Sequence, residues 1–178
     1  MIKQSLPRLG KHYYQGHAVV FWTNTLENRA KGWLTPAFHA TFREIMLHSA
    51  VRYGVWCPTY CLMPDHLHLV WMGMRPESDQ LSAMRFLRTE LKSALPNGCK
   101  WQHQAYDHIL REEERRKNAF ALTCFYILEN PVRKNLVTSA KIWPFNGAIV
   151  PGYPRLYPLE EGFWEKFWKL YKQARDMN

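Results

Sequence analysis

Two apolar runs separated by a three-residue turn limit the possible folds of this chain more than any other feature. Residues 55–62 and residues 66–72 are rich in apolar, β-branched and aromatic side chains, and Met63-Pro64-Asp65 lies between them. Runs of this length and composition predict β-strands, and a short turn between two strands predicts a β-hairpin. We expect the second strand to end at Gly73.

Helices and strands are expected before and after this hairpin in the sequence. A β-rich run over residues 18–25 precedes a helix that begins at Thr35-Pro36 and stops near Gly54. After the hairpin, Asp79 can cap a second helix, and residues 106–110 form a short strand. The order βαββαβ predicts an α+β fold with a ferredoxin-like antiparallel sheet, in which the helices lie on one face and the second hairpin strand is central.

The rest of the chain predicts two more helices. One runs over about residues 112–129, and the Asn130-Pro131 step should end or kink it, because proline disfavours helical geometry in the residue before it. Residues 143–178 supply an aromatic, proline-rich connection and a C-terminal amphipathic helix. A length of 178 residues fits one domain. We expect its main part over residues 1–142, with the C-terminal segment packed on it.

Charge and aromatic content favour a polyanionic partner. The chain has 24 Lys and Arg against 15 Asp and Glu, a net charge of +9, and it contains 8 Trp, 9 Tyr and 9 Phe. Positive charge and flat stacking surfaces are what single-stranded nucleic acid requires of a binding protein. No apolar stretch approaches the roughly 20 residues that span a bilayer. The basic start of the chain lacks an apolar signal core, so we expect a cytoplasmic location and no membrane partner.

Two pairs of polar side chains could build one site. His66 and His68 are two positions apart in an expected strand, so both point to one face and could hold a divalent ion. Tyr126 and Asn130 are four apart on an expected helix and off its apolar stripe, so they are neighbours, and the amide could add an oxygen ligand. The alternative is that the histidines are structural and the tyrosine is an ordinary surface residue.

Three blocks in this order resemble a known family. Residues 63–70 read MPDHLHLV, residues 106–111 read YDHILR and residues 126–133 read YILENPVR. With these blocks the chain resembles the HUH single-tyrosine transposases, in particular the REP-associated tyrosine transposases, from about residue 17 to residue 136. The resemblance implies an endonuclease and strand transferase that acts on single-stranded DNA, often at imperfect hairpins, through a covalent 5′-phosphotyrosine.

The resemblance also implies the role of each site residue. By matching position, His66 and His68 are metal ligands, Asn130 is a third ligand and Tyr126 is the nucleophile. The metal it implies is Mg²⁺ or Mn²⁺, although imidazole suits zinc and manganese better than magnesium. Members of the family include monomers and homodimers that exchange the tyrosine helix, so both states stay open. His108 either assists this site or is structural.

Six basic residues are expected to contact DNA. Three recur at helical spacing beside the apolar stripe of the second helix, one closes the second block, and two follow Tyr126, where they would place positive charge around the cleft. In chain order they are Arg85, Arg88, Lys92, Arg111, Arg133 and Lys134.

Two other functions are consistent with parts of this pattern. A noncatalytic module that binds single-stranded or hairpin nucleic acid would use the basic surface but needs neither a metal nor a phenol. A small metal hydrolase would use His66 and His68 to hold zinc and activate water, with no dependence on Tyr126.

Overall fold

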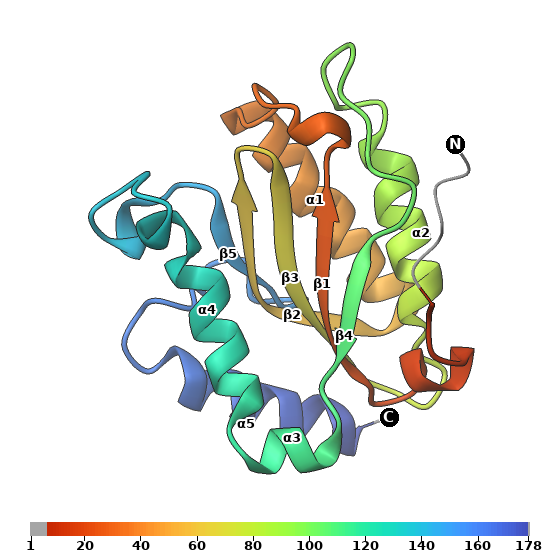
Figure 1. Cartoon of the computed structure of the whole chain (residues 1–178). Helices are drawn as coiled ribbons and strands as arrows, with labels where there is room; N and C mark the ends of the chain where they lie inside the picture. The colour runs from red at the N-terminus through yellow and green to blue at the C-terminus, as the bar shows by residue number, and fades with distance from the viewer. Residues whose placement is uncertain (1–6, 178) are drawn as a thin grey trace.

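The expected hairpin forms the middle of a five-stranded sheet in the computed structural model, which describes residues 7–177 (Figure 1). Strands β2 (Val55–Met63) and β3 (His66–Gly73) pair antiparallel, and β1 (Val19–Thr25) pairs with the other side of β3. Strand β4 (Tyr106–Ile109) lies beyond β1, so the order is β4-β1-β3-β2-β5. The α+β class and the central position of β3 are confirmed.

Helices α1 (Pro36–Tyr53) and α2 (Gln80–Leu91) cover one face of the sheet. The Thr35 hydroxyl oxygen accepts a hydrogen bond from the Phe38 amide at 3.0 Å, which caps the start of α1. Gly54 ends α1 with a φ of 64°, a left-handed conformation that glycine adopts without strain. Asp79 caps α2 by accepting from the Ser82 amide at 3.0 Å. The sequence signals at both ends of α1 and at the start of α2 therefore act as expected, whereas α2 ends at Leu91, before the expected stop at Pro96-Asn97-Gly98.

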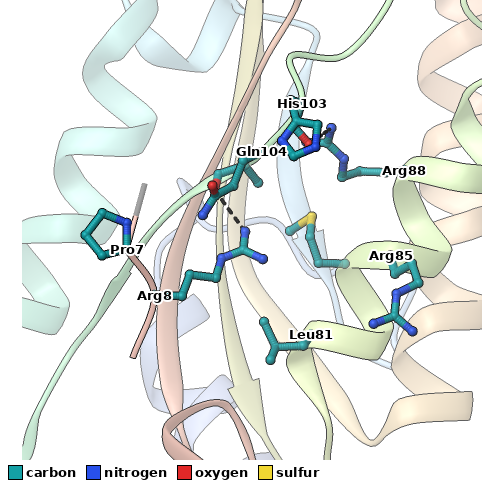
Figure 2. Close-up of a pocket in the computed structure, with 9 residues that line it drawn as sticks. Pro7, Arg8, Leu81, Arg85, Arg88, His103 and Gln104 are labelled. Atoms are coloured by element: carbon teal, nitrogen blue, oxygen red, sulfur yellow. Dashed lines mark hydrogen bonds between the residues drawn. The ribbon is translucent and has the colours of Figure 1, made fainter. Parts of the chain in front are cut away.

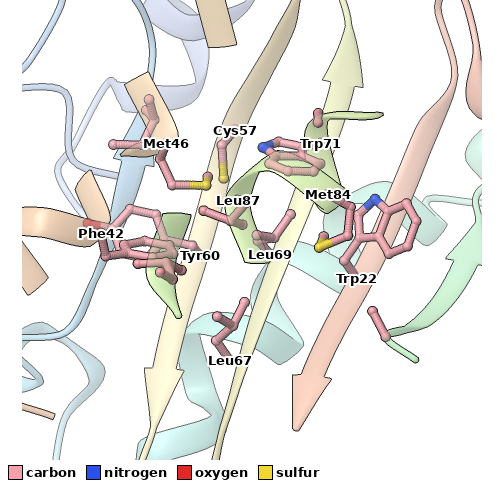
Figure 3. Packing of buried hydrophobic residues seen from close by; sticks show 14 of the residues in the cluster. Trp22, Phe42, Met46, Cys57, Tyr60, Leu67, Leu69, Trp71, Met84 and Leu87 are labelled. Atoms are coloured by element: carbon pink, nitrogen blue, oxygen red, sulfur yellow. The ribbon is translucent and has the colours of Figure 1, made fainter. Parts of the chain in front are cut away.

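The core between these two helices and the sheet contains the residues that alternate with the histidines on β3. Leu67 and Leu69 pack there with Trp22 of β1 and with Met84 and Leu87 of α2 (Figure 3). His66 and His68 consequently face the other side of the sheet, as the two-residue period of a strand requires.

Helices α4 (Ala119–Arg133) and α5 (Phe163–Asp176) cover that other face (Figure 1). Helix α4 packs mainly on β2 and also contacts β3. The buried aromatic side chains of α5 include Phe167, whose ring centroid lies 6.2 Å from that of Trp56 on β2. The sheet is thus enclosed between two helical layers, and the histidines lie under the layer that carries Tyr126.

The expected helix over residues 112–129 is in fact two helices. A short helix, α3 (Glu112–Arg116), is separated from α4 by Asn118, whose φ of 62° is left-handed. Asparagine adopts this conformation more readily than other side chains except glycine, so it can break a helix without an obvious sequence signal. The Asn130-Pro131 step does not end the helix, because α4 continues through Pro131 to Arg133, and a kink at this step stays a prediction. Because this buried proline lies in the last turn of α4, the helix loses few backbone hydrogen bonds.

The segment after residue 142 contains a fifth strand that the sequence did not predict. Strand β5 (Asn146–Ile149) pairs with β2 at the sheet edge. Its four residues include Gly147, and so short a run carries little periodicity. Short 3₁₀ helices cover Lys11–Tyr14 (η1), Glu27–Arg29 (η2) and Ala140–Ile142 (η3). In the described part of the chain, none of the helices combines the length and apolarity needed to cross a membrane.

A half-buried histidine in the α1 layer predicts loss of stability in acid. His39 lies beside Tyr60 and Arg43, and its Nε2 is 2.9 Å from the Tyr60 hydroxyl. Burial, and then the nearby Arg43 charge, lower the pKa of His39 from 6.5 to about 4. The unfolded chain therefore binds more protons than the folded chain between these values, so stability falls as the pH drops through this range. We expect His39→Gln to make the melting temperature fall less steeply between pH 6.5 and pH 4, whereas the same change at the exposed His48 should not.

Candidate active site

The two histidines of β3 converge on one point of the sheet face. His66 is 9% exposed and His68 is 6% exposed. Their Nε2 atoms lie 3.0 Å apart and form a hydrogen bond with each other. One Nε2 thus donates its proton to the lone pair of the other beneath the α4 layer, and a move of that proton to the other nitrogen of its own ring would leave a lone pair on each.

Each imidazole is oriented by a partner on its other nitrogen. His66 Nδ1 donates to the Asp65 carboxylate at 2.6 Å, and His68 Nδ1 lies 2.8 Å from the Thr23 hydroxyl. Arg29 in turn forms an ion pair with Asp65 at 3.2 Å. Partners of this kind hold a ligating histidine in one tautomer and leave the opposite nitrogen for a metal.

Burial keeps both imidazoles neutral near neutral pH. It lowers the pKa of His68 to about 3, with a further lowering from His66. Burial also lowers the pKa of His66, although the Asp65 carboxylate opposes this shift. Neutral imidazole is the form that binds metal ions.

Tyr126 lies directly beside this pair and comes from the same chain. Its ring centroid is 5.9 Å from that of His68 and 6.4 Å from that of Phe21. The Arg133 guanidinium carbon lies 4.9 Å from the centre of the Tyr126 ring. The side chain is 38% exposed, so a substrate can reach it. Helix α4 therefore places the Tyr126 ring beside the histidines of its own chain.

Asn130 lies one helical turn after Tyr126. It is 4% exposed, and its Nδ2 donates to the Tyr126 backbone carbonyl at 3.1 Å. This bond uses the amide nitrogen and leaves the amide oxygen outside it. In residues 7–177 no group of three His, Cys, Asp or Glu side chains could hold a metal ion. A third protein ligand at the histidine pair would therefore have to be of another type, such as an amide oxygen.

The spacing of the two histidines fits a divalent ion. Two neighbouring ligands of an octahedral ion with bonds of 2.0–2.1 Å are about 2.8–3.0 Å apart. Tetrahedral ligands at the same bond length are about 3.3–3.4 Å apart. The observed Nε2 separation of 3.0 Å is close to the octahedral value. It is also an ordinary hydrogen-bond length, so the same spacing suits both a hydrogen-bonded pair and a pair that holds an ion.

Arg133 and Lys134 lie on the Tyr126 side of the molecule. Both are exposed at the end of α4, and Lys134 is close enough to His66 to lower its pKa. Arg111 is exposed at the start of α3. These three residues are on the layer that contains the site.

Arg85, Arg88 and Lys92 do not flank the histidine pair, because α2 and its C-terminal extension lie across the sheet from it. Figure 2 shows Arg85 and Arg88 lining a pocket with Arg8. Arg88 is partly buried and donates to the Asn24 side chain at 2.9 Å and to the Gln102 backbone carbonyl. It therefore holds the segment after α2 against the sheet. Contact of these three residues with DNA remains a prediction.

His108 lies on the edge strand β4 rather than in the histidine pair. It is exposed, and its Nε2 is 3.0 Å from the Glu114 carboxylate.

Sequence reasoning missed two residues that orient the histidines. Asp65 was assigned only to a turn, and Thr23 becomes visible only when the register pairs it with His68.

Comparison with known proteins identifies a sequence relative and a solved structure that this chain resembles over most of its length. No protein-family model matches the chain. A protein of Haemophilus influenzae named as a candidate REP-associated tyrosine transposase is 27% identical over 158 residues, which cover 80% of this chain and 86% of the relative. A solved REP-associated tyrosine transposase bound to a REP hairpin matches with a TM-score of 0.65 and 23% identity, covering 80% of this chain and 82% of that one. The resemblance predicted from the sequence is confirmed.

Proposed function

We propose that this relative of the REP-associated tyrosine transposases is a DNA transposase that cuts and rejoins single-stranded DNA beside imperfect hairpins. The observation that carries the proposal is the position of Tyr126, whose ring lies 5.9 Å from that of His68 in the same chain. A surface phenol next to two converging imidazoles can act as the nucleophile in phosphoryl transfer. A noncatalytic binding module would not need such a group.

The proposed reaction is an exchange of one phosphoester bond for another. The Tyr126 hydroxyl oxygen attacks the phosphorus atom, the bond to the 3′ oxygen of the preceding nucleotide breaks, and the phenolic proton passes to solvent while the leaving 3′ oxygen gains one. A 5′-phosphotyrosine and a free 3′-hydroxyl result. The reverse exchange with another 3′-hydroxyl rejoins the strand, and no nucleotide cofactor is consumed.

The side chains around Tyr126 have distinct parts in this reaction. His66, His68 and the Asn130 amide oxygen would hold Mg²⁺ or Mn²⁺, and a bound ion would offset the charge of the non-bridging phosphate oxygens. Asp65 and Thr23 keep the imidazole Nε2 atoms facing one another. Arg133 places positive charge against the ring where phenolate charge develops in the transition state.

The proposed partner is a DNA hairpin, as in the solved relative. The net charge of +9 supports attraction to a phosphate backbone. One chain supplies both the histidine pair and the tyrosine, which supports action as a monomer. Because the substrate would be DNA, the expected cellular location remains the cytoplasm.

Formation of a covalent product tests the proposal. The protein should be incubated with Mn²⁺ and labelled single-stranded hairpins taken from the DNA that flanks its own gene. We expect a protein-DNA conjugate that survives denaturing electrophoresis and disappears after proteolysis. Tight hairpin binding without a conjugate or a nick in any of these substrates would instead support the noncatalytic binding module.

A further inference from the structure

We propose that Tyr106, together with Phe21, is a stacking surface for an unpaired DNA base close to the scissile phosphate. This role rests on the proposed function and extends it from the reacting groups to the residues that position the strand. It concerns the edge strand β4, which contributes neither to the histidine pair nor to the tyrosine helix.

The register of the sheet places Tyr106 on the same face as the active site. Tyr106 pairs with Thr23, and Thr23 pairs with His68 on its other side. Directly paired residues in an antiparallel sheet point to the same face. The neighbours of Tyr106 confirm this direction, because Ala105 is buried in the opposite core and Asp107 accepts a hydrogen bond from the buried Tyr14.

Tyr106 is left open by the helices above this face. Helix α4 packs mainly on β2 and β3, and β4 is the edge strand beyond β1 (Figure 1). The Tyr106 side chain is 51% exposed. Within residues 7–177 its hydroxyl forms no hydrogen bond, and its ring stacks on no other ring. An exposed aromatic residue on an edge strand favours aggregation. A binding role would explain why the chain has one at this position.

Phe21 connects Tyr106 to the nucleophile. It is the diagonal neighbour of Tyr106 across the β1–β4 pair, where it lies opposite His108. Its ring centroid is 5.3 Å from that of His68 and 6.4 Å from that of Tyr126. Phe21 therefore lies between the Tyr126 and His68 rings and the position of Tyr106, which is on the same sheet face one strand further out.

Charge around this aromatic surface favours nucleic acid as its occupant. Arg133 lies over the Tyr126 ring, and Arg111 is exposed just after β4. Aromatic rings interleaved with cations are the arrangement that binds single strands, because every base has a flat face and every nucleotide carries a phosphate. An aliphatic or neutral protein partner would gain nothing from these cations.

Fluorescence of a base analogue tests this inference directly. A hairpin with a single-stranded tail would carry 2-aminopurine at each of the positions next to the cleavage site, in separate substrates. Binding would be measured in a Tyr126→Phe background, so that the strand is not cut. We expect binding to quench the fluorescence at one or two positions. Tyr106→Phe should keep this quenching, whereas Tyr106→Thr, which keeps a high strand propensity, should lose it.

Affinity and a matched control complete the test. Tyr106→Thr should weaken binding of the tailed hairpin about tenfold, in line with the loss of one stacked base, and leave binding of the stem alone unchanged. Tyr153→Thr, at an exposed tyrosine far along the chain, should change neither measurement. Equal quenching and affinity for Tyr106→Thr and the parent would overturn the inference. The conjugate formed with Tyr126 intact reports separately on the proposed function.

Discussion

Replacing Tyr126 with phenylalanine should reduce the covalent protein-DNA product by at least about 1000-fold, because no other group can replace the attacking oxygen. The phenyl ring keeps the edge contact with Phe21 and the position under Arg133. Binding of the hairpin should therefore stay within about twofold of the parent protein. Both quantities can be measured with one labelled hairpin, on a denaturing gel for the product and on a native gel for binding.

The matched control for this change is Tyr106→Phe. Tyr106 is the other exposed phenol on the same sheet face, and its loss should leave the covalent product intact. Tyr60 needs no such control, because it is fully buried on the opposite side of the sheet and accepts a hydrogen bond from Arg43 at 2.6 Å. A conjugate that persists in Tyr126→Phe and disappears in Tyr106→Phe would show that Tyr106, and not Tyr126, is the nucleophile.

Much of the fold follows from local signals in the sequence. The cap at Thr35 and the glycine at position 54 set the ends of α1, and the short turn after Met63 makes β2 and β3 adjacent. These features depend on neighbours in the chain, so they can be recognised without tertiary information. The break at Asn118 has no such local signal, because asparagine is also common where no helix breaks.

Tertiary geometry explains why three of the expected DNA-contacting residues lie across the sheet from the histidine pair. Helical spacing shows that Arg85, Arg88 and Lys92 share a side of α2, but it does not show which face of the sheet α2 covers. The β3 pattern does carry that information, because its leucines must meet an apolar helical layer and its histidines then face away from α2. The same alternation places both histidines on one face, as the structure shows. It also implies that the cations of α2 lie on the opposite face, which the sequence prediction did not include.

The residues that orient the histidines illustrate a second limit of the sequence. Thr23 lies 45 residues before His68 in the chain, and nothing in its local pattern distinguishes it from other strand threonines. Its role depends on the register between β1 and β3, which a single sequence does not specify. Tyr106 joins the active-site face through the same register, so its proposed role also required the structure.

Replacing both histidines with alanine should abolish cleavage that depends on a divalent ion. In the described chain His66 and His68 are the two histidines whose Nε2 atoms hydrogen-bond to each other, and their removal would leave Asn130 alone among the three proposed ligands. We expect at least a 100-fold loss of both nicking and conjugate formation, together with the loss of Mn²⁺ binding measured by titration calorimetry. The exposed His48→Ala should change none of these quantities.

Thr23→Val offers a graded form of the same experiment, because it removes the partner of His68 Nδ1 but leaves both imidazoles in place. Loss of such a partner typically weakens metal affinity or activity about 10- to 100-fold. We therefore expect the activity of Thr23→Val to fall between that of the parent and that of the double alanine variant, with partial recovery at higher Mn²⁺ concentration.

Cleavage that continues unchanged in a chelator would show that the histidines are structural. Tightly bound zinc, with activity that survives Tyr126→Phe, would favour the hydrolase instead, because activated water would then replace the phenol as the nucleophile.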